Sequence, residues 1–208
     1  MNATPNLRTG GQILVDQLRI HGADTVFCVP GESYLATLDA LYDAQDDIKV
    51  VICRQEGGAA NMADAYGKLT GRPGIVFATR GPGAANASLG IHTAHQDSTP
   101  VILLLGQVGR AMMERDAFQE VEFREMFLPL AKWAAQIDDA ARIPEMVSRA
   151  FHVATSGRPG PVVLALPEDM QREQASANDA VRYTEIQAAP PPADMERLND
   201  MLDAAERP

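Results

Sequence analysis

A strand-to-helix junction between residues 48 and 63 is the most informative segment of this chain, and it reads IKVVICRQEGGAANMA. Its first six residues, 48–53, form an apolar run of strand length, and the small residues from Gly57 onward are typical of a closely packed helix. Glu56 stands between the two. A carboxylate is costly to bury, so one placed at such a junction usually has a partner or a chemical task. Glu56 is therefore the first candidate functional residue.

A second junction of the same kind follows in the next strand–helix unit. Residues 74–79 form an apolar run, and they lead into the glycine-rich segment TRGPGAAN at residues 79–86. In an open parallel sheet, the carboxyl ends of the strands meet at one edge, where ligands bind in a crevice. We therefore expect the two junctions to line a common crevice.

The rest of the chain continues the alternation of strands and helices. Thr9 and Gln12 fit a capping box at the start of the first helix. The expected strands and helices are, in chain order, a helix at 13–18, a strand at 25–29, a helix at 34–42, a strand at 100–106, a helix at 146–154 and a strand at 162–166. The strands are continuous apolar runs, which is typical of a parallel sheet covered on both faces. The pattern predicts a doubly wound α/β domain whose sheet has six mainly parallel strands.

The C-terminal residues differ from this domain. Residues 188–193 read AAPPPA, a stiff extended linker, and an amphipathic helical pattern follows it up to residue 208. We interpret residues 1–187 as one complete domain. Residues 188–208 are then a linker and the first helix of a second, truncated domain.

Composition and charge exclude several function classes. The chain has 208 residues and a net charge of −10, which argues against a nucleic-acid partner because phosphates require a basic surface. Cys28 and Cys53 have no neighbouring Cys or His cluster, so neither a zinc site nor a redox pair is predicted, and two buried thiols fit a reducing cytoplasm. No apolar run is long enough to span a membrane, and the N-terminus lacks the pattern of a signal peptide.

Five segments of the chain resemble, in order and in spacing, the thiamine-diphosphate enzymes of the acetolactate synthase type. The resemblance covers residues 8–170 and concerns their N-terminal, pyrimidine-binding domain. The matching segments are 54–65, 79–86, 106–108, 116–120 and 156–162.

This resemblance implies a cofactor, a substrate class and an assembly. The Gly-Asp-Gly and Asn-Asn motifs that bind diphosphate and Mg²⁺ in this family are absent here, so the chain is expected to be part of a longer polypeptide. The full protein would bind thiamine diphosphate and Mg²⁺, act on 2-keto acids in branched-chain amino acid biosynthesis, and form a homodimer or tetramer with its active site at the subunit interface. The fragment alone would be inactive. His92 and His95 are three residues apart, but no third ligand accompanies them and no metal site is predicted within this chain.

The resemblance gives Glu56 a catalytic role. It would hydrogen-bond N1′ of the aminopyrimidine, so that the 4′-amino group can take the proton from the thiazolium carbon. The cofactor then serves as the electron sink for decarboxylation. The alternative is a structural carboxylate stabilised by a helix N-terminus.

Several further residues match positions that line the cofactor pocket in this family. Glycine there allows the backbone to approach a ligand closely, whereas a plain strand–helix turn is the structural alternative. Arg80 departs from the Ser usual in acetolactate synthases and either pairs with an acidic neighbour or shapes the pocket. The matching residues are Pro30, Gly31, Thr79, Pro82, Gly83 and Asn86.

Glu32 is the most informative departure from the family, because acetolactate synthases resemble Pro-Gly-Gly where this chain has Pro-Gly-Glu. In related decarboxylases the third residue is polar and faces the substrate. Glu32 would then move protons or repel a second keto acid. The alternative is a solvated charge at a helix N-terminus.

Gln119 and Arg158 complete the candidate site. Phe118-Gln119 matches acetolactate synthases, in which the Gln reaches the cofactor region, whereas pyruvate decarboxylases resemble a His-His pair in this segment. Gln107 is expected either near the crevice or as a partner for backbone groups. Arg158 matches a position that contacts FAD in acetolactate synthases, but enzymes without FAD share this segment, so FAD stays open.

Two rival functions remain beside the carboligase. The first is a thiamine-diphosphate-dependent 2-keto-acid decarboxylase or lyase with another substrate, which Glu32 and Arg80 would favour. The second is a non-catalytic binding module, which this fold alone would permit.

Overall fold

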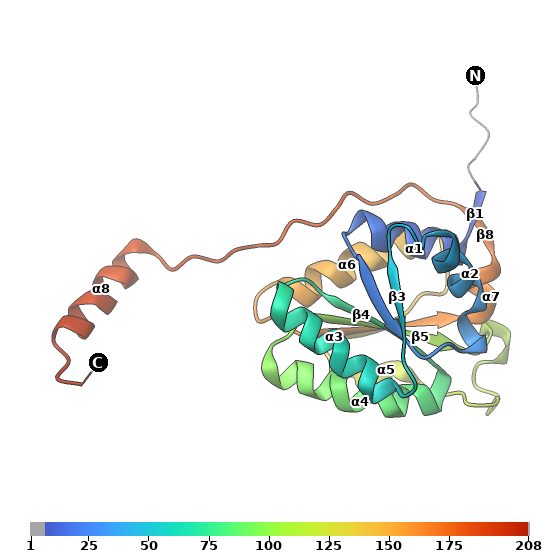
Figure 1. Cartoon of the computed structure of the whole chain (residues 1–208), viewed down its shortest axis with the longest axis horizontal. Helices are drawn as coiled ribbons and strands as arrows, with labels where there is room; N and C mark the ends of the chain where they lie inside the picture. The colour runs from blue at the N-terminus through green and yellow to red at the C-terminus, as the bar shows by residue number, and fades with distance from the viewer. Residues whose placement is uncertain (1–6, 208) are drawn as a thin grey trace, which may run out of the picture.

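The computed structural model describes residues 7–207, and most of them build a three-layer α/β domain (Figure 1). The central sheet has six strands in the order β3-β2-β4-β5-β7-β6, and all neighbours are parallel. The predicted doubly wound, parallel sheet is confirmed. Its strands are β2 (Thr25–Cys28), β3 (Lys49–Ile52), β4 (Gly74–Thr79), β5 (Val101–Gln107), β6 (Trp133–Gln136) and β7 (Pro161–Pro167).

Helices cover both faces of this sheet, and each face has its own apolar core. One layer contains α1 (Gly10–Ile20), α2 (Leu35–Asp43), α6 (Ile143–Thr155) and α7 (Glu168–Arg172). The other contains α3 (Glu56–Thr70), α4 (Arg80–Asp97) and α5 (Phe123–Phe127). Short 3₁₀ turns, η1 (Glu32–Tyr34), η2 (Arg110–Met112) and η3 (Ala140–Arg142), lie in the connections.

Local sequence explains where these helices begin and how closely they pack. Thr9 and Gln12 form the predicted capping box at the start of α1. Between α3 and α4, a Cβ atom added at Gly90 would lie 2.5 Å from the Cβ of Ala60. The two helices therefore touch through their small residues, which fixes the ends of α3 and α4 relative to each other.

The strands at the sheet's edges differ from the sequence prediction. The run 48–53 was expected to be buried on both faces, which is wrong for β3: it is an edge strand, and the side chain of Ile52 is 61% exposed. Cys53, expected to be buried, is only half-buried, whereas Cys28 on the central strand β2 is fully buried. The sixth strand, β6, had no predicted position, because its half-buried residues form no apolar run.

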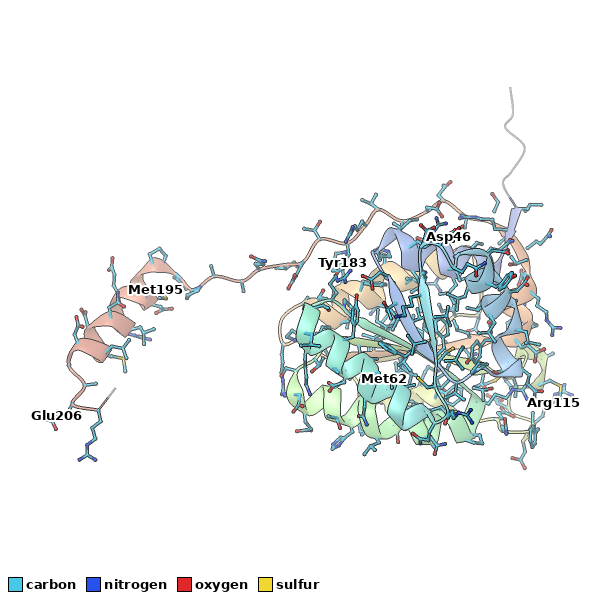
Figure 2. All side chains as sticks on the ribbon, viewed as in Figure 1. Asp46, Met62, Arg115, Tyr183, Met195 and Glu206 are labelled. Carbon is cyan, nitrogen blue, oxygen red and sulfur yellow. The ribbon has the colours of Figure 1, made fainter. Side chains whose placement is uncertain are left out.

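The chain leaves the domain through an extended segment. β1 (Leu7–Thr9) and β8 (Gln174–Ser176) form a separate antiparallel pair. The chain then crosses α1 and runs to α8 (Pro192–Asp203), which has no buried residue and stands clear of the sheet (Figure 1). Figure 2 shows the side chain of Met195 on α8 far from the domain, whereas Tyr183 lies against it. The division at residue 187 stays a prediction.

Candidate active site

The carboxyl ends of β2, β3 and β4 bring the two predicted junctions to one edge of the sheet. These three strands are neighbours in the order β3-β2-β4, and each ends where a candidate segment begins. Gly31 follows β2, Glu56 follows β3, and Arg80 follows β4. The two junctions therefore lie together at the carboxyl ends of the strands, as expected.

Glu56 is the first residue of α3 and is only 8% exposed. The side chain of Gln55 caps the helix by accepting a hydrogen bond from the Gly58 N–H at 2.8 Å, so the local turn is fixed. Asn86 Nδ2 donates to Glu56 Oε2 at 3.0 Å. Oε1 has no hydrogen-bond partner within residues 7–207. One oxygen of the carboxylate is thus held, and the other is available to a ligand.

One glycine leaves space beside this carboxylate, and a second one lets Thr79 pack closely next to it. A Cβ atom at Gly83 would lie 3.3 Å from Glu56 Oε1 and 3.5 Å from Thr79 Cγ2. A Cβ atom at Gly31 would lie 2.5 Å from the Thr79 Cβ, a distance that no side chain tolerates. Gly31, Thr79, Gly83 and Glu56 therefore form one continuous group of contacts.

A part-buried pair of hydroxyl groups and a buried tyrosine support this group. Ser33 Oγ and Thr79 Oγ1 are 2.6 Å apart and share a hydrogen bond. Tyr34 is fully buried, stacks on Phe77 with ring centroids 5.7 Å apart, and donates its hydroxyl to the carbonyl of Val29. Burial raises the pKa of Tyr34 well above its usual value, and the neighbouring charges of Cys28 and Glu56 raise it further. Tyr34 thus stays neutral, and its closely packed side chain supports the neighbouring residues rigidly.

The backbone of the predicted site is strained at two non-glycine residues, Arg80 and Gln119. Arg80 has φ of 25° and Gln119 has φ of 65°, both in the region that favours glycine. The Gly81 N–H donates to the carbonyl of Gln119 at 2.9 Å. The loop before β6 therefore brings Gln119 to the Thr79–Gly83 turn. Strain of this kind persists only where surrounding structure enforces it, and it concentrates at functional sites.

The loop that carries Gln119 is fixed by its own polar contacts. Glu120 accepts hydrogen bonds from the backbone N–H groups of Ala117 and Glu114, at 2.9 and 2.6 Å, and these donors lower the pKa of Glu120. Gln107 is fully buried, donates to the carbonyl of Val121 at 2.8 Å and accepts from the Val108 N–H. Of the two expectations for Gln107, the structure shows the second, a partner for backbone groups.

Arg80 forms an ionic cluster that connects three strands of the sheet. Its Nη2 lies 3.0 Å from Glu168 Oε2, and its Nη1 lies 3.6 Å from Glu32 Oε1. Arg172 also pairs with Glu168, at 2.6 Å. The expected pairing of Arg80 with an acidic neighbour is thus present. Sequence reasoning missed Glu168, although it carries the same signal as Glu56, a carboxylate directly after an apolar strand.

Arg158 lies at the amino ends of the strands, opposite to the carboxyl ends where Glu56 lies. It precedes β7, and its guanidinium donates to Ser98 Oγ at 2.7 Å and to the carbonyls of His95 and Gln96 at 3.2 and 2.9 Å, at the end of α4. The structure therefore does not bring Arg158 together with Glu56. Its contact with FAD stays a prediction.

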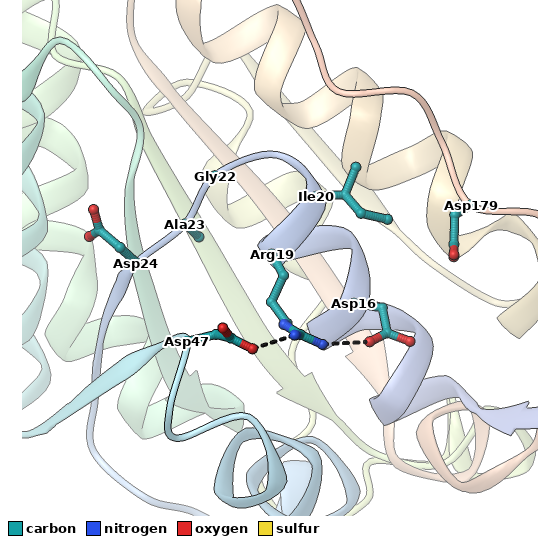
Figure 3. Close-up of a pocket in the computed structure, with 8 residues that line it drawn as sticks. All are labelled: Asp16, Arg19, Ile20, Gly22, Ala23, Asp24, Asp47 and Asp179. Atoms are coloured by element: carbon teal, nitrogen blue, oxygen red, sulfur yellow. Dashed lines mark hydrogen bonds and ion pairs between the residues drawn. The ribbon is translucent and has the colours of Figure 1, made fainter.

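A cavity of about 620 Å³ also lies at those amino ends (Figure 3). Asp24 and Asp47 stand before β2 and β3, and Arg19 already pairs with Asp47 and Asp16.

Residues 7–207 contain no cluster of three His, Cys, Asp or Glu side chains that could hold a metal ion. No helix in the same range is long and apolar enough to cross a membrane.

The chain is similar in sequence to a known protein family and to curated proteins. Residues 8–126 match the model for the thiamine pyrophosphate enzyme, N-terminal TPP binding domain. The chain is 42% identical over 168 residues, 80% of its length, to an acetolactate synthase of Arthrospira platensis, of which this covers 29%. It is 37% identical over 199 residues, 96% of its length, to the acetolactate synthase isozyme 2 large subunit of Escherichia coli K12, of which this covers 36%. The chain thus spans about a third of the length of these curated relatives. It belongs to the thiamine pyrophosphate enzymes and contains their N-terminal, TPP-binding domain.

Proposed function

We propose that the full-length protein is a thiamine-diphosphate-dependent carboligase that joins two 2-keto acids with loss of CO₂, as an acetolactate synthase does. The single observation that carries this proposal is Glu56, which is buried at the carboxyl ends of the strands. One of its oxygens is held by Asn86, and the other has no hydrogen-bond partner among residues 7–207. The names of the relatives support the reaction class.

The residues around Glu56 fit the aminopyrimidine of the cofactor. Gly83 leaves out a Cβ atom that would lie 3.3 Å from Glu56 Oε1, and Gly31 leaves room for the side chain of Thr79. When bound, thiamine diphosphate supplies the electron sink for the electron pair that remains when the keto acid loses CO₂. Glu56 holds and returns a proton at N1′ of the pyrimidine, and Asn86 keeps the carboxylate in place for this.

The remaining parts of the proposal concern the rest of the protein. Diphosphate and Mg²⁺ would be held by a C-terminal domain outside this chain, and FAD by a surface that includes Arg158. The active site would lie between subunits of a homodimer or tetramer in the cytoplasm. Residues 188–208 would lead into a central domain, for which the exposed apolar face of α8 provides support.

The test uses the full-length protein with pyruvate, thiamine diphosphate and Mg²⁺, with products followed by NMR. Acetolactate is the expected product. Glu56→Gln should lower kcat by about 10²- to 10⁴-fold, because the proton relay is lost while the shape is kept. Glu125→Gln, an exposed carboxylate on α5, is the matched control and should be neutral. Near-normal turnover in Glu56→Gln would refute the assignment of the site.

A second candidate function is a 2-keto-acid decarboxylase or lyase with another substrate. The Glu32–Arg80–Glu168 cluster favours it, because it places charge beside the cofactor site. Release of CO₂ from a keto acid without a carboligated product would identify this function. Absence of thiamine diphosphate binding by the full-length protein would instead indicate a non-catalytic binding module.

A further inference from the structure

A network of polar side chains is buried where the turn η1 meets the carboxyl ends of β4 and β7. Ser33 Oγ and Thr79 Oγ1 share a hydrogen bond at 2.6 Å. Gln171 Nε2 donates to the carbonyls of Ser33 and Leu166 at 3.0 and 2.9 Å, and Gln171 Oε1 accepts from the hydroxyl of Thr37 at 2.8 Å. Ser33, Thr37 and Gln171 are fully buried. Each polar side-chain atom of this set, the Ser33 network, therefore has a partner.

The neighbouring strand β5 leaves the Ser33 side chain little room to move. A Cβ atom added at Gly106, on β5, would lie 1.9 Å from Ser33 Oγ and 2.7 Å from Ser33 Cβ. Ser33 is thus seated against the bare backbone of β5, while Thr79 holds its hydroxyl and Gln171 holds its carbonyl. A shift of η1 would break one of these hydrogen bonds or bring Ser33 into the backbone of β5.

Stability alone does not account for a buried network of this kind. Burying a polar group costs free energy unless the group is hydrogen-bonded, and replacing both partners by apolar groups of the same shape is nearly neutral or stabilising. A fully satisfied network differs from an apolar core in that it makes one arrangement rigid and unique. The Ser33 network therefore contributes mainly a defined position of η1.

The position of η1 matters to the surroundings of Glu56 through Thr79. Gly31, directly before η1, packs so closely on Thr79 that an added Cβ atom would lie 2.5 Å from Thr79 Cβ. A Cβ atom on Gly83 would lie 3.5 Å from Thr79 Cγ2 and 3.3 Å from Glu56 Oε1. The methyl group of Thr79 and the free oxygen of Glu56 therefore lie against the same glycine.

We propose that the Ser33 network is a positioning device for the cofactor: it fixes Gly31 and Thr79 so that the aminopyrimidine is held against Glu56. Ser33 and Gln171 are positioning residues that act through Thr79. The inference rests on the proposed function, because it takes the space beside Glu56 as the pyrimidine site. Loss of one neutral hydrogen bond of the network should weaken cofactor binding by about 2- to 12-fold.

The experiment measures the Kd of thiamine diphosphate for the full-length protein by calorimetry in the presence of Mg²⁺. The variants are Ser33→Ala, Thr79→Val and the double variant of the two. Thr37→Val removes only the hydrogen bond to Gln171. Thr155→Val is the matched control, because Thr155 is also buried and donates its hydroxyl to the carbonyl of Phe151 at 2.9 Å, at the end of α6 that precedes β7. Thermal unfolding of each protein without cofactor gives its stability.

Ser33→Ala and Thr79→Val should each raise the Kd by about 2- to 12-fold. The double variant should raise the Kd no more than the larger single effect, because both changes remove the same hydrogen bond. Thr37→Val should shift the Kd in the same direction. Thr155→Val should lower the unfolding temperature and leave the Kd unchanged, which separates positioning from a purely structural role.

A wild-type Kd in folded Ser33→Ala, or the same rise in Thr155→Val, overturns the inference, and so do additive effects in the double variant. If Thr79→Val does not fold, Ser33→Ala and Thr37→Val against Thr155→Val decide. Absence of cofactor binding by the wild type overturns the proposed function. Cofactor binding without acetolactate from pyruvate also overturns the proposed function, and the Kd values then still decide the inference.

Discussion

Protonation of His21 should weaken the attachment of the extended C-terminal segment to the domain. His21 is 2% exposed and stacks on Phe151 with ring centroids 4.8 Å apart. Its Nδ1 accepts a hydrogen bond from the Tyr183 N–H at 3.1 Å. A protonated imidazole cannot accept this bond, because both ring nitrogens are then donors. Acid should therefore destabilise the folded chain through this one residue.

The magnitude follows from the shift in the pKa of His21. Burial lowers that pKa to about 4, and repulsion from His152 and Arg182 contributes to the same direction. The unfolded chain has the ordinary value of 6.5. Between these two values the unfolded state binds more protons than the folded state, so stability rises with pH and is lost as pH falls. The contribution lost is about 2 kcal/mol at pH 5 and about 3 kcal/mol at pH 3.5.

The assay is urea unfolding of the 208-residue chain at several pH values between 7.5 and 3.5, followed by the fluorescence of the single tryptophan, Trp133. The matched variant is His21→Asn, which keeps an acceptor near the position of Nδ1 but cannot be protonated. Other titrating groups contribute equally to both proteins. The wild type should therefore lose about 2–3 kcal/mol more than the variant over this range.

Parallel curves of unfolding free energy against pH for the two proteins would refute this reasoning. If His21→Asn does not fold, an NMR titration of the His21 ring in the wild type decides the question. A pKa of 6 or higher for the His21 ring would show that the ring is solvated or that the Tyr183 N–H does not donate to it.

Two further predictions concern packing and reactivity. Gly90→Ala should lower the free energy of unfolding by about 1–3 kcal/mol, because the added Cβ meets Ala60 at 2.5 Å. Leu89→Ala, at an exposed position on the same helix, should change this free energy little. Equal effects of the two substitutions would contradict the close contact between the helices. Burial raises the pKa of Cys28 to about 11. Iodoacetamide at pH 8 should therefore label half-buried Cys53 first, and Cys28 only when the chain unfolds. Detection of modified Cys28 in the native chain by mass spectrometry would contradict this prediction.

Local signals predicted the strands and helices well wherever the signal lies within one element. The run 74–79 corresponds to β4 (Gly74–Thr79), and the Thr9 capping box begins α1 as expected. The apolar pattern failed for β6 (Trp133–Gln136), since its residues are only half-buried. It also missed β1 and β8, whose three-residue strands are paired across more than 160 residues. Short strands of this kind depend on a partner distant in sequence.

The candidate site was predicted in its location but only partly in its contacts. Glu56 and Thr79 lie at one edge because strands of one parallel sheet end there, and that follows from the pattern of strands and helices. The hydrogen bond from Asn86 to Glu56 joins α4 to α3, and no local pattern specifies it. Likewise, Gln107 was expected either near the crevice or against the backbone, and only its burial under the loop at Val121 decided between them.

The sequence by itself determined the α/β class, the position of the two junctions and the family, because apolar runs, turn residues and short motifs are properties of neighbouring residues. The tertiary structure decided which strand is an edge strand and which carboxylates form ion pairs with Arg80. It also decided that Arg158 lies at the amino ends of the strands, away from Glu56. These outcomes depend on strand order and on the packing of helices across the sheet. Both are set by the total burial of apolar surface, to which every element contributes at once.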